Sequence, residues 1–215
     1  MKIMAINGSP RKNGNTAALL EKALEGAASL GADTEMIHLY DLDFKGCTSC
    51  FACKLKNGPS YGRCAMEDDL TPVLEKIGTC HALVLGSPVY FGDVTGEMRS
   101  FMERLFFPNL AYSRNYRTIF PGMLKTAFIY TMNVKEEAMK ERGYDKWTEK
   151  NESLMKWFFG HCESLFSFNT LQFDDYSLYV SDMFDPEEKM EQHKKVFSLD
   201  LESSFELGKR LAQND

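Results

Sequence analysis

The sequence predicts an α/β fold built on a doubly wound parallel sheet of five strands. Apolar runs of about five residues recur, each followed by glycine, proline or polar residues and then by a stretch with helical spacing. Such alternation of strand and helix is typical of parallel sheets. The chain has 215 residues, 44% of them hydrophobic and 26% charged. This is enough apolar material for the core of one large domain. We therefore expect a single domain over residues 1–215.

The expected strands are the apolar runs bounded by turn residues. The fourth run is apolar nearly throughout, which is typical of a strand buried on both faces. Turn and breaker residues separate each run from the helical segment beside it. The five runs cover residues 2–7, 34–39, 82–86, 126–132 and 171–179.

The expected helices lie between these strands. Apolar residues share one face from Leu20 to Ala27, and Gly31 stops the pattern. A final helix is expected to begin at Pro186, because proline suits the first helical turn. Further helical stretches are expected over residues 70–77, 96–105 and 136–165.

Two long segments have no regular pattern. One is a cysteine-rich loop over residues 46–65, and the other is an aromatic insertion over residues 106–122. Irregular segments of this length inside a compact domain are usually functional. We expect both to serve the function of the protein.

The charge balance excludes some classes of partner. The 25 basic residues are outnumbered by 31 acidic ones, which gives a net charge of -6 and predicts no binding to nucleic acid or to an anionic membrane. No stretch approaches the roughly 18–20 apolar residues of a transmembrane helix. Polar residues from Asn7 onward come too early for a signal peptide. These features predict a cytoplasmic protein.

The loop after the first expected strand is suited to bind an anion. It reads GSPRKNGNT over residues 8–16, so it offers backbone N–H groups, hydroxyls and the N-terminus of the next helix. Arg11 or Lys12 can add a charge-assisted contact. The loop is not a Walker A motif, because Asn15 and Thr16 follow Gly14 where lysine is required. The alternative is that these residues only form turns and cap the helix.

The loop after the third expected strand has a different chemistry. Residues 86–96 read GSPVYFGDVTG, a proline-stiffened turn that carries Tyr90 and Phe91 between glycines. Such a loop can pack against a flat aromatic ligand and bring its backbone close to it. Because the carboxyl ends of parallel strands share one edge of the sheet, we expect this loop to lie beside the first one.

The two loops together strongly resemble the flavodoxin-like NAD(P)H-dependent FMN reductase superfamily. The matching segments read GSPRKNGNT and GSPVYFGDVTGEMRSFMERL, and the later KTAFIYTMNV and FDDYSLYVSD are similar to the fourth and last strands of that family. The resemblance implies a three-layer flavodoxin-like fold with strand order 2-1-3-4-5. It also implies that FMN is bound by Ser9, Arg11, Asn13, Asn15, Thr16, Pro88, Val89, Tyr90, Phe91, Gly92, Thr131, Met132 and Asn133.

Four cysteines have a spacing that favours a metal cluster. Cys47, Cys50, Cys53 and Cys64 form C-x2-C-x2-C-x10-C, and a close triplet favours iron over zinc, which more often uses two separate pairs. The segment GCTSCFACK resembles the iron–sulfur flavoprotein branch of the family, which implies a four-iron four-sulfur cluster near the flavin. The gap before Cys64 is longer than in that branch. The alternative is a set of loop thiols without a cluster.

The resemblance implies an oxidoreductase that transfers electrons from NAD(P)H through FMN to a small acceptor such as a flavin or quinone. The flavin carries this chemistry, so we expect no catalytic side chain. None of His38, His81, His161 and His193 is expected to bind a metal or act as a base. The alternatives are an iron–sulfur electron carrier with ferredoxin-like partners and, more remotely, a zinc-stapled nucleotide-binding module. A homodimer or homotetramer is also expected by analogy.

Overall fold

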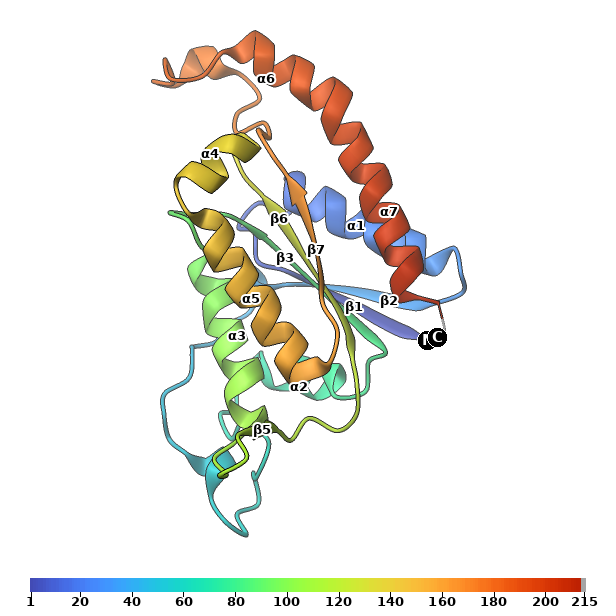
Figure 1. Ribbon diagram of the computed structural model, residues 1–215, viewed down its shortest axis with the longest axis vertical. Helices are drawn as coiled ribbons and strands as arrows, with labels where there is room; N and C mark the ends of the chain where they lie inside the picture. Colours follow the sequence, from blue (N-terminus) through green and yellow to red (C-terminus); the bar gives the residue numbers. More distant parts are fainter. Residues whose placement is uncertain (214–215) are drawn as a thin grey trace.

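A computed structural model describes residues 1–213 and confirms the predicted fold class (Figure 1). Its main sheet has five parallel strands in the order β2-β1-β3-β6-β7. If the small hairpin of β4 (Leu110–Ala111) and β5 (Arg117–Thr118) is set aside, this is the expected order 2-1-3-4-5. The strands are β1 Lys2–Asn7, β2 Asp33–His38, β3 Ala82–Pro88, β6 Lys125–Thr131 and β7 Glu163–Ser167.

Helices cover both faces of the sheet, and each face has its own apolar core (Figure 1). The helices are α1 Asn15–Ala28, α2 Thr71–Ile77, α3 Gly96–Asn109, α4 Glu136–Glu141, α5 Tyr144–Phe159, α6 Pro186–Gln192 and α7 Ser198–Leu211. Strand β1 contributes to both cores because its side chains alternate: Ile3 and Ala5 pack with α1 and α7, whereas Met4 and Ile6 pack with α2 and α3.

Helices α1 and α7 approach each other unusually closely. A Cβ atom added to Gly26 of α1 would lie 2.0 Å from the carbonyl oxygen of Phe205. One added to Gly208 of α7 would lie 1.8 Å from the carbonyl oxygen of Ala23. The two glycines therefore allow backbone-to-backbone packing that a larger residue would prevent.

The last strand lies earlier in the chain than predicted. The edge strand β7 is Glu163–Ser167, and the expected strand over 171–179 is wrong: that segment is a loop with the short 3-10 helix Tyr176–Leu178. The loop's aromatic residues pack on one another instead, with the rings of Phe173 and Tyr179 stacked at 4.0 Å. The expected helix over 136–165 is two helices and ends at Phe159, because Gly160 takes a left-handed conformation at φ 92°.

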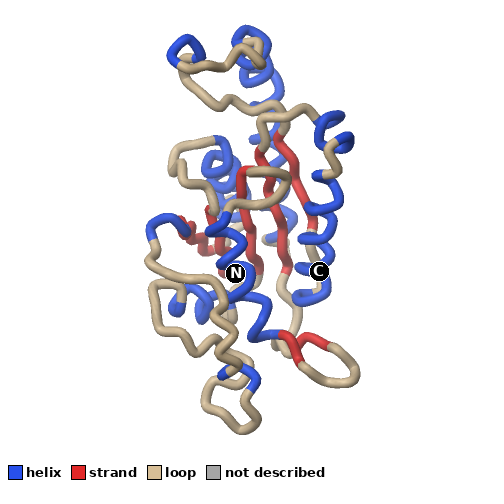
Figure 2. Tube along the Cα trace, turned by 90° about the vertical axis from the view of Figure 1, so that its left-hand side faces the viewer, coloured by secondary structure: helices blue, strands red, loops and turns tan. Residues whose placement is uncertain are grey.

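The aromatic insertion begins later than predicted. Helix α3 continues through Pro108 to Asn109, so the first residues of the expected irregular segment are helical. They are followed by a two-stranded hairpin, β4 Leu110–Ala111 and β5 Arg117–Thr118, which projects from the lower end of the molecule in Figure 2. The cysteine-rich loop lies at the same end in Figure 1, and its only regular element is a 3-10 turn, Ala52–Lys54, which we call η2. Within residues 1–213, we find no helix with the length and apolar character needed to cross a membrane.

Candidate functional site

The loops at the carboxyl ends of the strands enclose an open groove of about 890 Å³. The loops that follow β1, β3, β6 and β7 all contribute to its walls. These loops are far apart in the sequence, but parallel strands bring them to one edge of the sheet. The residues expected to bind FMN that line the groove are Ser9, Arg11, Asn13, Asn15, Thr16, Pro88, Val89, Tyr90, Thr131, Met132 and Asn133.

Two of the expected residues lie outside the lining. The backbones of Tyr90 and Asp93 exchange hydrogen bonds of 2.8 and 3.2 Å, which closes a tight turn. Phe91 takes a positive φ of 54° in this turn, and its side chain is fully exposed to solvent. Gly92 follows with φ 91°, where an added Cβ would lie 2.9 Å from the ring of Tyr144. The turn therefore directs Phe91 away from the groove.

The start of helix α1 leaves its first backbone N–H groups available. Its N-cap residue is Gly14, no side chain caps it, and its first turn holds no acidic residue. The loop before it is held by its own hydrogen bonds, from Ser9 N to Asn7 Oδ1 at 2.9 Å and from Arg11 N to Ser9 Oγ at 3.1 Å. Uncapped donors and the helix dipole together form a site for an anion such as a phosphate.

Side-chain hydrogen bonds connect the loops around the groove. Thr95, the N-cap of α3, donates its hydroxyl to the carbonyl of Gly8 at 2.7 Å. The hydroxyls of Thr16 and Thr131 are 2.7 Å apart, and both side chains are buried. These contacts hold the loops at the carboxyl ends of β1, β3 and β6 in fixed positions relative to one another.

Sequence reasoning missed one wall of the groove. Residues Thr170 to Asp174, together with Tyr179, His193 and Phe197, also line it. This wall is tied to the first loop, because Arg11 Nη1 donates to the carbonyl of Gln172 at 2.5 Å and Asn15 Nδ2 donates to that of Leu171 at 2.8 Å. The polar pair Asn169-Thr170, which follows β7, could have indicated this wall. It was overlooked because the last strand was expected over residues 171–179, after this pair rather than before it.

All four clustered cysteines line a second, small cavity of about 10 Å³, at the other end of α3. Their thiols are free, as are those of Cys80 and Cys162. Within residues 1–213, no three Cys, His, Asp or Glu side chains are arranged to hold a metal ion. The structure thus brings Cys47, Cys50, Cys53 and Cys64 to one cavity without placing them in a coordination geometry.

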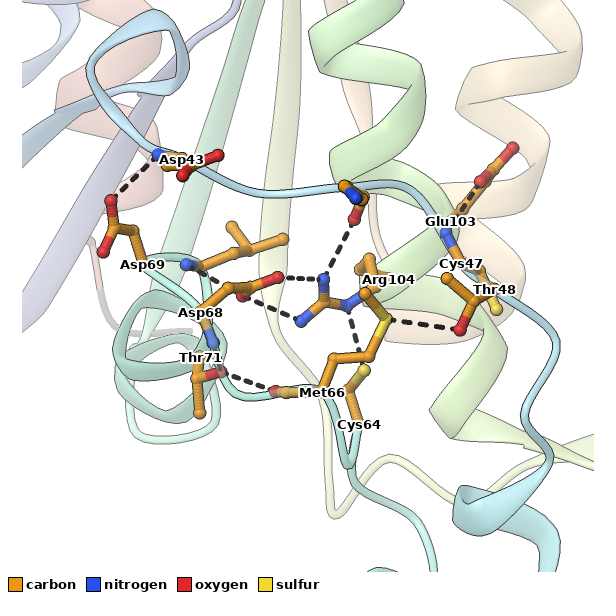
Figure 3. Close-up of polar contacts among 12 residues, drawn as sticks. Asp43, Cys47, Thr48, Cys64, Met66, Asp68, Asp69, Thr71, Glu103 and Arg104 are labelled. Atoms are coloured by element: carbon orange, nitrogen blue, oxygen red, sulfur yellow. Dashed lines mark hydrogen bonds and ion pairs between the residues drawn. The ribbon is translucent and has the colours of Figure 1, made fainter.

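A buried arginine holds the fourth cysteine against α3 (Figure 3). The Nε of Arg104 donates to the Sγ of Cys64 at 2.9 Å, and its Nη1 and Nη2 donate to the carboxylate of Asp68 at 2.7 and 3.1 Å. Nη1 also donates to the carbonyl of Lys45 at 2.9 Å. The guanidinium keeps the pKa of Asp68 below its usual value, mainly through these hydrogen bonds.

A second cation, Lys54, follows Cys53 in the chain. The ammonium of Lys54 donates to the carbonyls of Phe107, Pro108 and Leu110, the last two at 3.1 and 2.5 Å, and burial lowers its pKa. Burial also raises the pKa of the Cys53 thiol, and the three other cysteines raise it further through charge repulsion. All four cysteines line this one cavity, which is the structural basis for that repulsion.

The two remaining cysteines lie apart from this cavity. Cys162 is buried, and burial raises the pKa of its thiol to about 11. Cys80 is partly buried, with its pKa also raised by burial, and its thiol donates to the carbonyl of Lys76. Neither residue lines the cysteine cavity.

Comparison with known proteins gives consistent matches. The family described as NADPH-dependent FMN reductase matches residues 1–132. An iron-sulfur flavoprotein of Archaeoglobus fulgidus is 44% identical over 117 residues, which cover 54% of this chain and 53% of that protein. The chain thus spans about half the length of such curated relatives. A putative NAD(P)H-dependent FMN-containing oxidoreductase of Bacillus subtilis is 29% identical over 83% of this chain and 84% of that protein.

Two solved structures share the fold over 98% and 99% of the chain. An NAD(P)H:quinone oxidoreductase from Methanothermobacter marburgensis aligns with a TM-score of 0.72 and 14% identity over 98% of both chains. An FMN-dependent NADH-azoreductase from Bacillus anthracis, in complex with FMN, aligns with a TM-score of 0.67 and 12% identity over 99% of both chains. At these identities the likeness establishes the flavodoxin-like fold alone.

Proposed function

Because the chain belongs to the NADPH-dependent FMN reductase family, we propose that it binds FMN in the groove and transfers electrons from NAD(P)H to a small acceptor such as a flavin or quinone. The observation that carries the proposal is the groove itself. Residues from the GSPRKNGNT and GSPVYFGDVTG motifs, which are about 80 positions apart, line one cavity beside an uncapped helix N-terminus.

The FMN phosphate fits the first loop. The N-terminal N–H groups of α1 supply donors, the hydroxyl of Ser9 lies in the same loop, and Arg11 supplies a positive charge. A single electropositive loop is enough, so the overall charge of -6 does not oppose FMN binding.

The flavin ring fits the wall formed by Pro88, Val89 and Tyr90. Tyr90 is 46% exposed, so a flat ligand can cover it. Met132 and Asn133 face the same groove from the end of β6. When bound, the flavin accepts hydride from the nicotinamide, and these residues orient it and limit the access of water.

Arg11→Ala is expected to weaken FMN binding by about 1–3 kcal/mol, because it removes a charge-assisted hydrogen bond to phosphate. It also frees the carbonyl of Gln172, which Arg11 contacts. Titration of the apoprotein with FMN, followed by the quenching of flavin fluorescence, measures the change.

Lys12→Ala is the matched control. It removes a charge of the same sign from the same loop, but the ammonium of Lys12 is already paired with Asp41 at 2.7 Å. We therefore expect a smaller loss of FMN affinity than for Arg11→Ala. If the Arg11 variant binds FMN as tightly as the parent protein does, Arg11 does not contact the FMN phosphate.

A specific observation favours a second role, in which the chain also carries an iron–sulfur cluster and exchanges electrons with ferredoxin-like partners. The four cysteines line one cavity, and the cations of Arg104 and Lys54 lie beside it. Four cysteine thiolates are the ligands that a four-iron four-sulfur cluster uses, so the chemistry of this donor set fits such a cluster. In the structure the hydrogen bond from Arg104 brings Cys64 to the cavity despite the long gap before it.

The two candidate sites lie at opposite ends of helix α3. Its N-cap Thr95 contacts the first loop, whereas Phe107 and Pro108 line the cysteine cavity. A helix of 14 residues is roughly 21 Å long at about 1.5 Å per residue. We propose that electrons pass between cluster and flavin through a second protein, because the two sites of one chain lie at opposite ends of this helix. A homodimer or homotetramer would supply that second protein as another copy of this chain.

A further inference from the structure

Lys189 of helix α6 is a buried cation next to the groove. Its side chain is 3% exposed, and its ammonium donates to three oxygens: the backbone carbonyl of Asn133 at 2.9 Å, the side-chain Oδ1 of Asn133, and the carbonyl of Thr170 at 3.4 Å. The ring of Phe184 lies 5.2 Å away. Asn133 and Thr170 both line the groove, so Lys189 stands directly behind its wall.

No carboxylate among residues 1–213 pairs with this ammonium. The neighbouring Glu188 is paired with Lys135 at 2.5 Å instead. Burial lowers the pKa of Lys189 to about 8, so the side chain still carries its charge at neutral pH. Burying a charge without a counter-ion costs folding free energy, and such charges are usually found at functional sites.

The ammonium fixes the orientation of the Asn133 amide. An ammonium group only donates hydrogen bonds, so the atom facing it is the amide oxygen. The amide nitrogen is then directed the other way, where it donates to Oε1 of Gln172 at 2.8 Å on the groove wall. One amide N–H of Asn133 is thus used by Gln172, and the second N–H is the donor that Asn133 can offer to a ligand in the groove.

We propose that Lys189 is a positioning residue for the reduced cofactor: it holds Asn133 as a donor and places a positive charge behind the groove wall that stabilises reduced FMN. The proposal rests on FMN binding in the groove. Hydride transfer breaks a C–H bond of the nicotinamide and forms an N–H bond on the flavin, which leaves NAD(P)⁺ and a flavin with one additional negative charge. A fixed cation nearby favours that charged product over oxidised FMN.

The test is the midpoint potential of bound FMN in Lys189→Met. For unit charges about 10 Å apart at an effective dielectric constant of about 20, Coulomb's law gives roughly a tenfold effect. We therefore expect the affinity for reduced FMN, relative to oxidised FMN, to fall about tenfold. This corresponds to a decrease of about 30 mV for a two-electron couple. Lys189→Arg keeps the charge and should restore most of the potential.

Lys135→Met is the matched control, because it removes a neighbouring lysine that is exposed and paired with Glu188. We expect less than a twofold change in the same affinity ratio. If Lys189→Met does not fold, Asn133→Asp provides a second route, since a carboxylate against the ammonium cancels its charge and should lower the potential in the same direction.

The possible results separate this proposal from the proposed function. If the parent protein takes up no FMN, FMN binding in the groove is wrong and the role of Lys189 fails with it. If the parent protein binds FMN but Lys189→Met weakens both redox forms equally, Lys189 only supports the fold. A potential unchanged in both Lys189→Met and Asn133→Asp would also overturn the proposal.

Discussion

Arg104→Met is expected to destabilise the folded chain by about 3 kcal/mol, because it leaves the partly buried carboxylate of Asp68 without its ion-pair partner. Arg104 is fully buried and Asp68 is 16% exposed at its side chain, so water can replace only some of the lost hydrogen bonds. The same change frees the thiol of Cys64. We therefore also expect the variant to retain less iron after reconstitution. Urea unfolding and iron analysis measure the two effects.

The pH dependence gives an internal check on this explanation. Arg104 holds the pKa of Asp68 below its ordinary value of about 3.9, so the pair stabilises the fold above that pH and loses its effect as pH falls through the lowered pKa. In the variant, burial favours protonation of Asp68. The difference in unfolding free energy between parent and variant should thus be full at neutral pH and shrink below about pH 4.

Two controls identify the buried pair as the cause. Lys195→Met breaks an exposed ion pair with Glu191 and should cost at most about 0.5 kcal/mol. The double variant Arg104→Met/Asp68→Asn should cost less than the sum of its single changes, because each removes the same interaction. A loss below about 1 kcal/mol for Arg104→Met would contradict the account.

Gly208→Ala is expected to destabilise the chain by about 3 kcal/mol or more, at the upper end of overpacking effects. The added methyl would lie 1.8 Å from the carbonyl oxygen of Ala23, and this neighbour is backbone, which cannot turn aside. Helices α1 and α7 must then separate. This outweighs the gain of about 1 kcal/mol that alanine brings over glycine in a helix. The midpoint and slope of urea unfolding report the loss.

Gly96→Ala is the matched control for this change. Gly96 begins helix α3, and an added Cβ there meets nothing within 4 Å. We expect it to be neutral or slightly stabilising. If both variants unfold at the same urea concentration as the parent, the close packing of α1 on α7 does not contribute as the structure indicates.

The sequence predicted the two loops of the groove because their residues are local signals. Gly8 to Thr16 and Gly86 to Gly96 each combine a buried strand with turn residues, so their place at one edge of the sheet follows from the strand order. The core helices were predicted for the same reason, since an apolar face repeats within a few turns.

Contacts between distant segments could not be predicted in this way. Arg104 and Asp68 are 36 positions apart, and Lys189 and Asn133 are 56 apart, so no local pattern connects them. The strand β7 was missed because its sequence, Glu-Ser-Leu-Phe-Ser, is only partly apolar, as suits an edge strand. The more apolar loop after it was mistaken for the strand. Phe91 was placed in the site because its aromatic character was visible but the turn that directs it outward was not.

The most direct test of the central claim is the reaction of the reconstituted protein with pyridine nucleotide. The chain is prepared without oxygen, loaded with FMN, freed of excess flavin, and analysed for flavin, iron and zinc. We predict that bound FMN loses its visible absorbance when NADH or NADPH is added and regains it when a quinone is supplied. Bound iron with reduction only by ferredoxin would favour the electron-carrier role. A protein that retains no FMN, or whose FMN neither nucleotide reduces, would contradict the account.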